Sequence, residues 1–131
     1  MRTNDSLTNC ISKIFYSDPD LFNRNGWDLE AYTTTILYFF ISYKNTFKVK
    51  HPYLSVNKTK DVMLKLSNDY YKLSPEETIY FIDEYFNTKY KNCDYNILHF
   101  VAGDIRLYLN YKMIWIKELI IWAYQRKNKK Q

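Results

Sequence analysis

Glycine and proline are scarce in this chain, which contains two glycines and three prolines among its 131 residues. Because these two residues mark turns and loops, their scarcity excludes a fold of many short elements with frequent tight turns. It predicts instead a few long elements that are joined by brief polar connections.

Cysteine and histidine are equally rare, with two of each. Cys10 falls on the apolar face of an expected helix and Cys93 falls in a polar turn, so we interpret them as a small hydrophobic residue and a surface thiol. The spacing of Cys93 and His99 matches no zinc-binding pattern, and two further ligands are missing. We therefore expect no disulfide, no metal site and no cofactor.

Common catalytic motifs are also absent, because the sequence has no glycine-rich phosphate loop, no HExxH and no GxSxG. The acidic pairs Glu76-Glu77 and Asp83-Glu84 consist of sequence neighbours, whose side chains point in different directions around a helix. These acids are typical of a solvated helix surface. The sequence therefore predicts a protein that is not an enzyme.

No apolar run is long enough to cross a membrane. The richest stretch, 113–124, is interrupted by Lys117 and Glu118 and is shorter than the roughly 20 residues that span a bilayer. The first residues lack the apolar region of a secretory signal. We expect a cytoplasmic protein that does not contact membranes.

Aromatic residues, in contrast, make up 19% of the chain and supply a large apolar area for packing helices together. Apolar residues recur at helical spacing along most of the sequence. The expected helices are 6–16, 29–45, one that starts at Asn57 or Thr59, 75–90, one that Asp94 caps, and 113–126. The last two form either one long helix or two that bend near Asn110. Residues 47–56 are expected as a short β-hairpin or an extended segment.

These elements predict one all-α domain over residues 1–131, a compact bundle of five or six helices. Helices 28–45 and 113–126 are expected at its centre, because both are apolar on most sides. Residues 126–131 are expected as a frayed basic tail. Asn25-Gly26 indicates a turn, Asp28 a helix cap, and Ser74-Pro75-Glu76-Glu77 a capping box.

A polar stripe is expected on the helix that follows Asp94. It comprises Asn96, His99, Gly103, Arg106 and Asn110, at spacings of three and four residues. A solvent-facing side of the helix is one interpretation. A polar groove that binds a partner is the other, since Gly103 costs about 1 kcal/mol relative to alanine inside a helix and permits close approach.

Helix 113–126 is a candidate for self-association. Trp115, Leu119 and Trp122 lie on it among other apolar residues, which either fill the core or contact another chain. A two-fold pair of such helices would cover apolar area that the domain leaves over. We therefore expect a homodimer.

Charge is distributed unevenly. Residues 44–65 carry six lysines and one aspartate, net +5, whereas residues 66–88 carry one lysine and five acids, net −4. Basic residues near aromatic ones are typical of phosphate contact. The candidates for nucleic-acid contact are Lys48, Lys50, Lys58, Lys60, Arg126, Lys127, Lys129 and Lys130. Against this interpretation, arginine is scarce, and AT-rich codons alone produce a chain rich in Lys, Asn, Tyr, Ile and Phe.

No stretch of the sequence resembles the motif of a known family, so function is inferred from surfaces. The sequence predicts a small intracellular regulatory or adaptor protein that binds another protein and is encoded by a phage, plasmid or virus with an AT-rich genome. The alternative is a nucleic-acid-binding protein that uses residues 44–65 and the basic tail. The third hypothesis is an enzyme with a polar site around His99 and Arg106.

Overall fold

The fold is all-α, as the sequence predicts. The computed structural model describes residues 3–68, 73–91, 93–102, 114, 118 and 121–126. The helices are α1 (Thr3–Ser17), α2 (Pro19–Phe22), α3 (Leu29–Phe47), α4 (Val56–Leu66), α5 (Pro75–Asn87) and α6 (Ile97–Phe100). Residues 114, 118 and 121–126 are also helical. No strand occurs within these ranges, which hold only an isolated β-bridge between Arg24 and Trp27.

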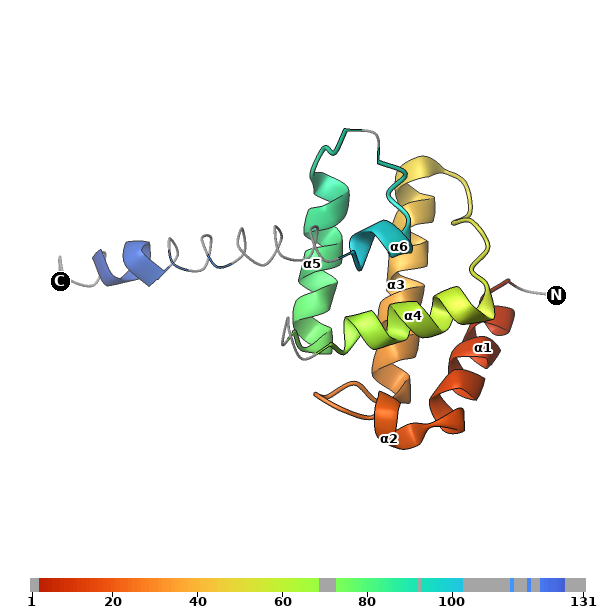
Figure 1. Cartoon of the computed structure of the whole chain (residues 1–131). Coiled ribbons are helices and arrows are strands. Elements are labelled where there is room, and N and C mark those ends of the chain that lie inside the picture. Colours follow the sequence, from red (N-terminus) through yellow and green to blue (C-terminus); the bar gives the residue numbers. More distant parts are fainter. Residues whose placement is uncertain are drawn as a thin grey trace.

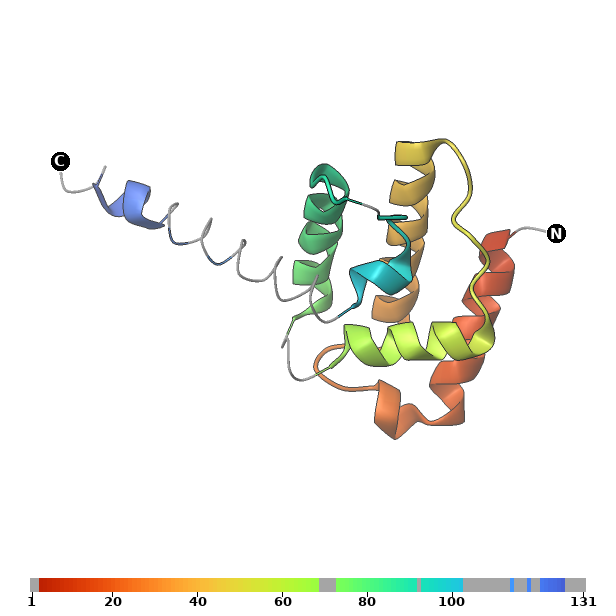
Figure 2. The same ribbon diagram turned by 45° about the horizontal axis from the view of Figure 1, so that its top comes forward.

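Helix α3 organises the bundle because it contacts both α1 and α5. Figure 1 shows α3 and α5 side by side with α6 between them, and α4 runs crosswise from beside the lower end of α5, past α3, to α1. Figure 2 shows the same crossing after rotation, and α4 contacts α1 and α6. No helix in the described part of the chain combines the length and apolar character needed to cross a membrane.

Local capping chemistry fixes where the long helices start. The Asp28 side chain accepts a hydrogen bond from the Ala31 backbone N–H at 2.8 Å, and α3 begins one residue after Asp28. At α5, Ser74 accepts from the Glu77 N–H while Glu77 accepts from the Ser74 N–H, both at 3.1 Å. These reciprocal bonds satisfy two backbone donors that a helix start leaves without partners. The predicted Asp28 cap and Ser74 capping box are confirmed.

The Asn25-Gly26 turn is also confirmed, and it delivers Trp27 into the core. Asn25 and Gly26 have φ values of 58° and 82°, and the Trp27 N–H donates to the Arg24 carbonyl oxygen at 2.8 Å. Two successive residues with positive φ characterise a tight turn of type I′, which Asn-Gly favours. Trp27 is completely buried directly after this turn.

Two aromatic clusters, both with members on α3, make up much of the core. The first surrounds Tyr32, whose ring packs against Phe15, Phe22 and Trp27. The second surrounds Tyr85 and joins α3, α5, α6 and the loop before α6, through Phe39, Phe86, Tyr90, Tyr95, His99 and Phe100. Aromatic pairs with tilted or edge-to-face rings contribute beyond their buried area. The aromatic-rich composition is thus used for internal packing.

Several predicted boundaries are wrong. Of the two alternatives for residues 47–56, the hairpin does not form, and residues 48–55 connect α3 to α4 without strand pairing. Ser55 rather than Asn57 or Thr59 starts α4, because its side chain accepts from the Lys58 N–H. Asn96 rather than Asp94 caps α6. Tyr95 has a φ of 56°, a left-handed conformation that does not continue into a helix, so the cap falls one residue later.

The expected central position of helix 113–126 is wrong for the part that can be assessed. Residues 114, 118 and 121–126 are all exposed. In both views the blue segment 121–126 stands away from the helical body. In contrast, α3 is central as predicted, since Tyr32, Ile36 and Phe39 are completely buried.

Candidate functional site

A cluster of three reactive side chains lies where α5, the following loop and α6 meet. Tyr85 comes from α5, Cys93 from the loop, and His99 from α6. The Tyr85 hydroxyl lies 2.6 Å from His99 Nδ1 and 3.4 Å from Cys93 Sγ. Cys93 Sγ lies 3.0 Å from the same imidazole nitrogen. We call these three residues the thiol cluster.

The loop that carries Cys93 is held in place by hydrogen bonds from Tyr95. The Tyr95 hydroxyl donates to the Thr88 carbonyl oxygen at 2.7 Å and accepts from the Tyr90 N–H at 2.8 Å. The Tyr95 backbone N–H donates to Cys93 Sγ at 3.2 Å. Cys93 is therefore a half-buried residue in a specific network, which corrects its interpretation as a surface thiol.

His99 is positioned by a hydrogen bond from its backbone N–H and by ring packing. The Asn96 side chain accepts from the His99 N–H at 2.9 Å and thereby fixes the first turn of α6. The imidazole ring packs against Tyr85 and Tyr90, with ring centroids 5.7 and 5.8 Å apart. Burial, together with the hydrogen-bond contact with Cys93, raises the pKa of Tyr85 far above its ordinary value. The Tyr85 hydroxyl therefore stays protonated at any physiological pH.

Of the predicted polar stripe, only the first two members can be placed. Asn96 caps α6 and His99 joins the thiol cluster, so the two residues act on the protein's own chain. Gly103, Arg106 and Asn110 lie outside the described residues. In the sequence, Cys93 and His99 were paired only as possible zinc ligands, and Tyr85 was not recognised as a partner of either. Their separations of 14 and 6 residues match no periodic signal, although a cysteine and a histidine in one short segment were a visible clue.

A second histidine, His51, binds the start of α6 from a segment that lies 46 residues earlier in the sequence. His51 Nε2 accepts from the Ile97 N–H at 2.9 Å, and His51 Nδ1 lies 2.8 Å from the Pro52 carbonyl oxygen. Its ring stacks on Phe40, with centroids 4.2 Å apart. Burial lowers the pKa of His51 below its ordinary value. His51 thus joins the α3–α4 connection to the start of α6.

The predicted self-association surface is placed in part. Trp122 is 57% exposed, and it lies beside Ile121 at 55% and Tyr124 at 67%. The Arg126 guanidinium carbon lies 5.2 Å from the centre of the Trp122 ring, within the range of a cation–π contact. Trp115 and Leu119 lie outside the described residues. We call residues 121–126 the C-terminal segment.

The four lysines of the predicted nucleic-acid surface are all exposed, but they do not share one face. Lys48 ends α3 and Lys50 lies in the following connection, while Lys58 and Lys60 lie on α4. Residues two positions apart on a helix differ by about 200° in direction, so Lys58 and Lys60 point to different sides. Tyr53, between these pairs, is 88% exposed. Arg126 is exposed, and Lys127, Lys129 and Lys130 lie outside the described residues.

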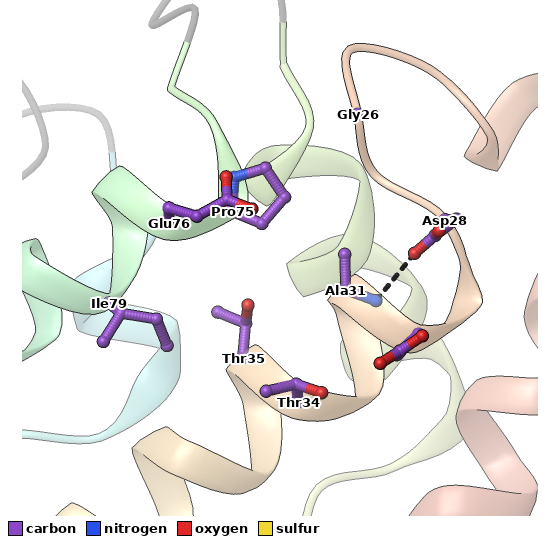
Figure 3. A pocket seen from close by; sticks show the side chains of 9 residues that line it. Gly26, Asp28, Ala31, Thr34, Thr35, Pro75, Glu76 and Ile79 are labelled. Carbon is purple, nitrogen blue, oxygen red and sulfur yellow. Dashed lines mark hydrogen bonds between the residues drawn. The ribbon is translucent and has the colours of Figure 1, made fainter.

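Two of the cavities lined by described residues lie away from the thiol cluster. The first, about 340 Å³, lies between the starts of α3 and α5 and is lined by Gly26, Asp28, Ala31, Thr35, Pro75 and Glu76 among others. Figure 3 shows that the Asp28 carboxylate is bonded to the Ala31 N–H and so serves the helix cap. The second, about 410 Å³, lies between α1 and residues 51–56, and apolar side chains form much of its lining. Neither cavity gathers polar groups with a shared chemical task.

Comparison of the chain with protein-family models, curated proteins and solved structures found no match. The function must therefore be argued from the geometry alone.

Proposed function

We propose that this protein is a small non-enzymatic regulatory or adaptor protein that acts by binding protein chains, with the C-terminal segment as its binding surface. The observation that carries the proposal is the exposure of Ile121, Trp122 and Tyr124 within one helical turn, where Ile121 lies between the other two around the helix axis. A contiguous exposed apolar patch typically marks an interaction site. Single exposed apolar residues elsewhere on the molecule require no such explanation.

The composition of the C-terminal segment supports an interface. Trp, Tyr and Arg are the residue types most enriched at the energetic centres of protein interfaces, and Trp122, Tyr124 and Arg126 fall within five consecutive residues. Their rings are large and have few rotatable bonds, so they bury area with little loss of conformational entropy. Arg126 lies one turn after Trp122 and against its ring, so the cation and this ring are suited to one contact, while Tyr124 lies on the other side of Ile121.

The proposed first partner is a second copy of the chain. In a two-fold symmetric dimer the same patch of each copy packs against that of the other, so each apolar surface is covered by its equivalent. Residues 121–131 carry Arg126, three lysines and no acid. Like charges repel, so an antiparallel arrangement, which places the two basic ends far apart, is favoured over a parallel one.

We expect light scattering to give the mass of a dimer at micromolar concentration, and the double variant Ile121→Asp/Trp122→Asp to give a monomer. Buried like charges and lost apolar area both oppose the contact. The matched control is Tyr80→Asp on α5, because Tyr80 is similarly exposed at 66% and lies away from the segment. A monomeric mass for the unmodified protein at every concentration would contradict self-association.

Nucleic-acid binding is the second candidate, and the exposure of Tyr53 among basic residues is the observation that favours it. Lys50 precedes Tyr53 in the α3–α4 connection, and Lys58 follows it in the first turn of α4. An exposed aromatic ring can stack on an unpaired base while nearby lysines contact the phosphates. The divergent directions of Lys58 and Lys60 limit how many lysines one strand can contact.

If this second function holds, replacing Lys48, Lys50, Lys58 and Lys60 by alanine should weaken binding and flatten its salt dependence. Each phosphate contact that is lost removes roughly one unit from the slope of log affinity against log salt. Gel shifts and fluorescence titrations at two salt concentrations measure both quantities. The control is Lys89→Ala, an exposed lysine that follows the end of α5. Absence of binding to single- and double-stranded DNA and RNA at low salt rules this candidate out.

A further inference from the structure

Cys93 is surrounded by groups that can accept its proton and stabilise the resulting anion. His99 Nδ1 lies 3.0 Å from Cys93 Sγ, the Tyr85 hydroxyl lies 3.4 Å from it, and the Tyr95 N–H donates to it at 3.2 Å. Three different elements of the chain supply a base, a hydroxyl and a backbone donor to one sulfur atom. This arrangement distinguishes Cys93 from Cys10, for which no hydrogen bond to a histidine is found among the described residues.

The hydrogen positions in the neutral cluster follow from donor and acceptor capacity. A neutral imidazole nitrogen has either one hydrogen or one lone pair, and the shortest contact to Nδ1 is the Tyr85 hydroxyl at 2.6 Å. Tyr85 therefore donates to Nδ1, and the Cys93 thiol donates to the Tyr85 oxygen. The Tyr95 N–H donates to the sulfur. Each of the three donors named here then has an acceptor.

We propose that Cys93 is a reactive thiol activated by His99 through Tyr85, and that low-molecular-weight disulfides modify it to a mixed disulfide. Deprotonation moves two hydrogens along existing bonds. The Cys93 proton passes to the Tyr85 oxygen while the Tyr85 proton passes to His99 Nδ1. The product is a thiolate that accepts from the Tyr85 O–H and the Tyr95 N–H beside a positively charged imidazole. A thiolate is the form that attacks disulfides.

The reaction is balanced without a further reactant. The Cys93 thiolate attacks one sulfur of the small disulfide, forming a new S–S bond and breaking the original one. The departing thiolate takes the proton from the imidazolium and leaves as a thiol. Cys93 is oxidised, the departing sulfur is reduced, and the cluster returns to its neutral state. Because Tyr85 remains a neutral phenol, it serves only to pass on the proton and to donate to sulfur.

The test follows the modification of both cysteines in one molecule. The protein is incubated with excess oxidised glutathione at pH 7.5, and peptide mass spectrometry measures the rate at each cysteine. Cys10 is the internal control, since it is also half-buried but lies on α1 away from the thiol cluster. We expect Cys93 to react at least about tenfold faster than Cys10.

His99→Gln is the decisive variant, because the glutamine carbonyl oxygen can still accept from Tyr85 but cannot act as a base. It should bring the Cys93 rate to within about threefold of the Cys10 rate, with circular dichroism confirming the helical fold. Equal rates at the two cysteines, or an unchanged Cys93 rate in His99→Gln, would overturn the proposal.

Discussion

Replacing Trp27 by alanine should lower the free energy of unfolding by about 3–5 kcal/mol, as expected for deleting a large buried side chain. Trp27 is completely buried, and its ring centroid lies 5.2 Å from that of Tyr32. Its Nε1–H donates to the Leu73 carbonyl oxygen at 3.1 Å, across 46 residues of sequence. Because Leu73 directly precedes the cap of α5, this one side chain ties the Asn25-Gly26 turn to the start of that helix.

Trp27→Phe separates the two contributions to this effect. Phenylalanine keeps most of the apolar contact but leaves the Leu73 oxygen without its donor, which costs about 1–3 kcal/mol for a buried group. We therefore expect the free energy of unfolding of Trp27→Phe to lie between that of the parent protein and that of Trp27→Ala. Urea denaturation followed by circular dichroism gives all three values.

Tyr53→Ala is the matched control for these two substitutions, because Tyr53 is an aromatic residue that is 88% exposed. Its removal should change the stability by no more than about 0.5 kcal/mol. A loss below about 1 kcal/mol for Trp27→Ala would mean that Trp27 does not hold the two segments together.

The parts of the fold that could be predicted are those decided by short-range chemistry. The Asp28 cap and the Ser74 capping box depend on side chains within three residues of the backbone groups they bond, and the Asn25-Gly26 turn depends on the positive φ values of its two residues. Such interactions leave a local signature in the sequence. The same reasoning failed at Asp94, because the left-handed conformation of Tyr95 shifts the cap to Asn96.

The thiol cluster could not be predicted, because it depends on how a loop folds back. Tyr85 and His99 meet only when residues 88–91 and 93–96 return the chain to the side of α5, and Tyr95 fixes that return through the Thr88 carbonyl oxygen. Periodicity reports which face of a helix is apolar, but it carries no information about such a closure. His51 was missed for the same reason, since its partner Ile97 is 46 residues away.

The C-terminal segment shows a different limit of sequence reasoning. Its apolar side chains indicated a buried helix, yet Ile121, Trp122 and Tyr124 are more than half exposed. An apolar pattern shows that a helix surface favours burial. Whether the same chain or another chain buries it depends on whether the other helices leave room for it in the core. Here α1 and α5 already pack against α3.

Stability should also depend on pH through His51, because its hydrogen bonds require the neutral ring. Nε2 accepts from the Ile97 N–H, so the ring hydrogen must be on Nδ1, which donates to the Pro52 carbonyl oxygen. A proton added to Nε2 would face the Ile97 donor and break this bond. The surrounding rings of Phe39, Phe40 and Tyr43 carry no charge that could offset the added one. Burial accordingly lowers the pKa of His51 in the folded protein.

The sign of the effect follows from the lowered pKa. An unfolded chain binds a proton at a histidine below about pH 6.5, whereas folded His51 binds it only at a lower pH. Above pH 6.5 both states are neutral and the full stability is present. As the pH falls below 6.5, the unfolded state gains protons that the folded state does not, so stability is lost by up to about 1.4 kcal/mol per pH unit.

We therefore expect the free energy of unfolding to fall by up to about 2 kcal/mol between pH 7 and pH 5 through His51 alone. Groups that titrate elsewhere add to the measured slope, so the comparison must be with His51→Gln. Glutamine has an oxygen that can accept from the Ile97 N–H and has no proton to gain in this range. Urea denaturation at pH 7, 6 and 5 should show a flatter dependence for His51→Gln, while His99→Gln keeps the His51 contribution. If the parent protein and His51→Gln lose stability in parallel, the neutral His51 ring does not control the acid sensitivity of the fold. The start of α6 then holds without it, since the Asn96 cap remains at every pH in this window.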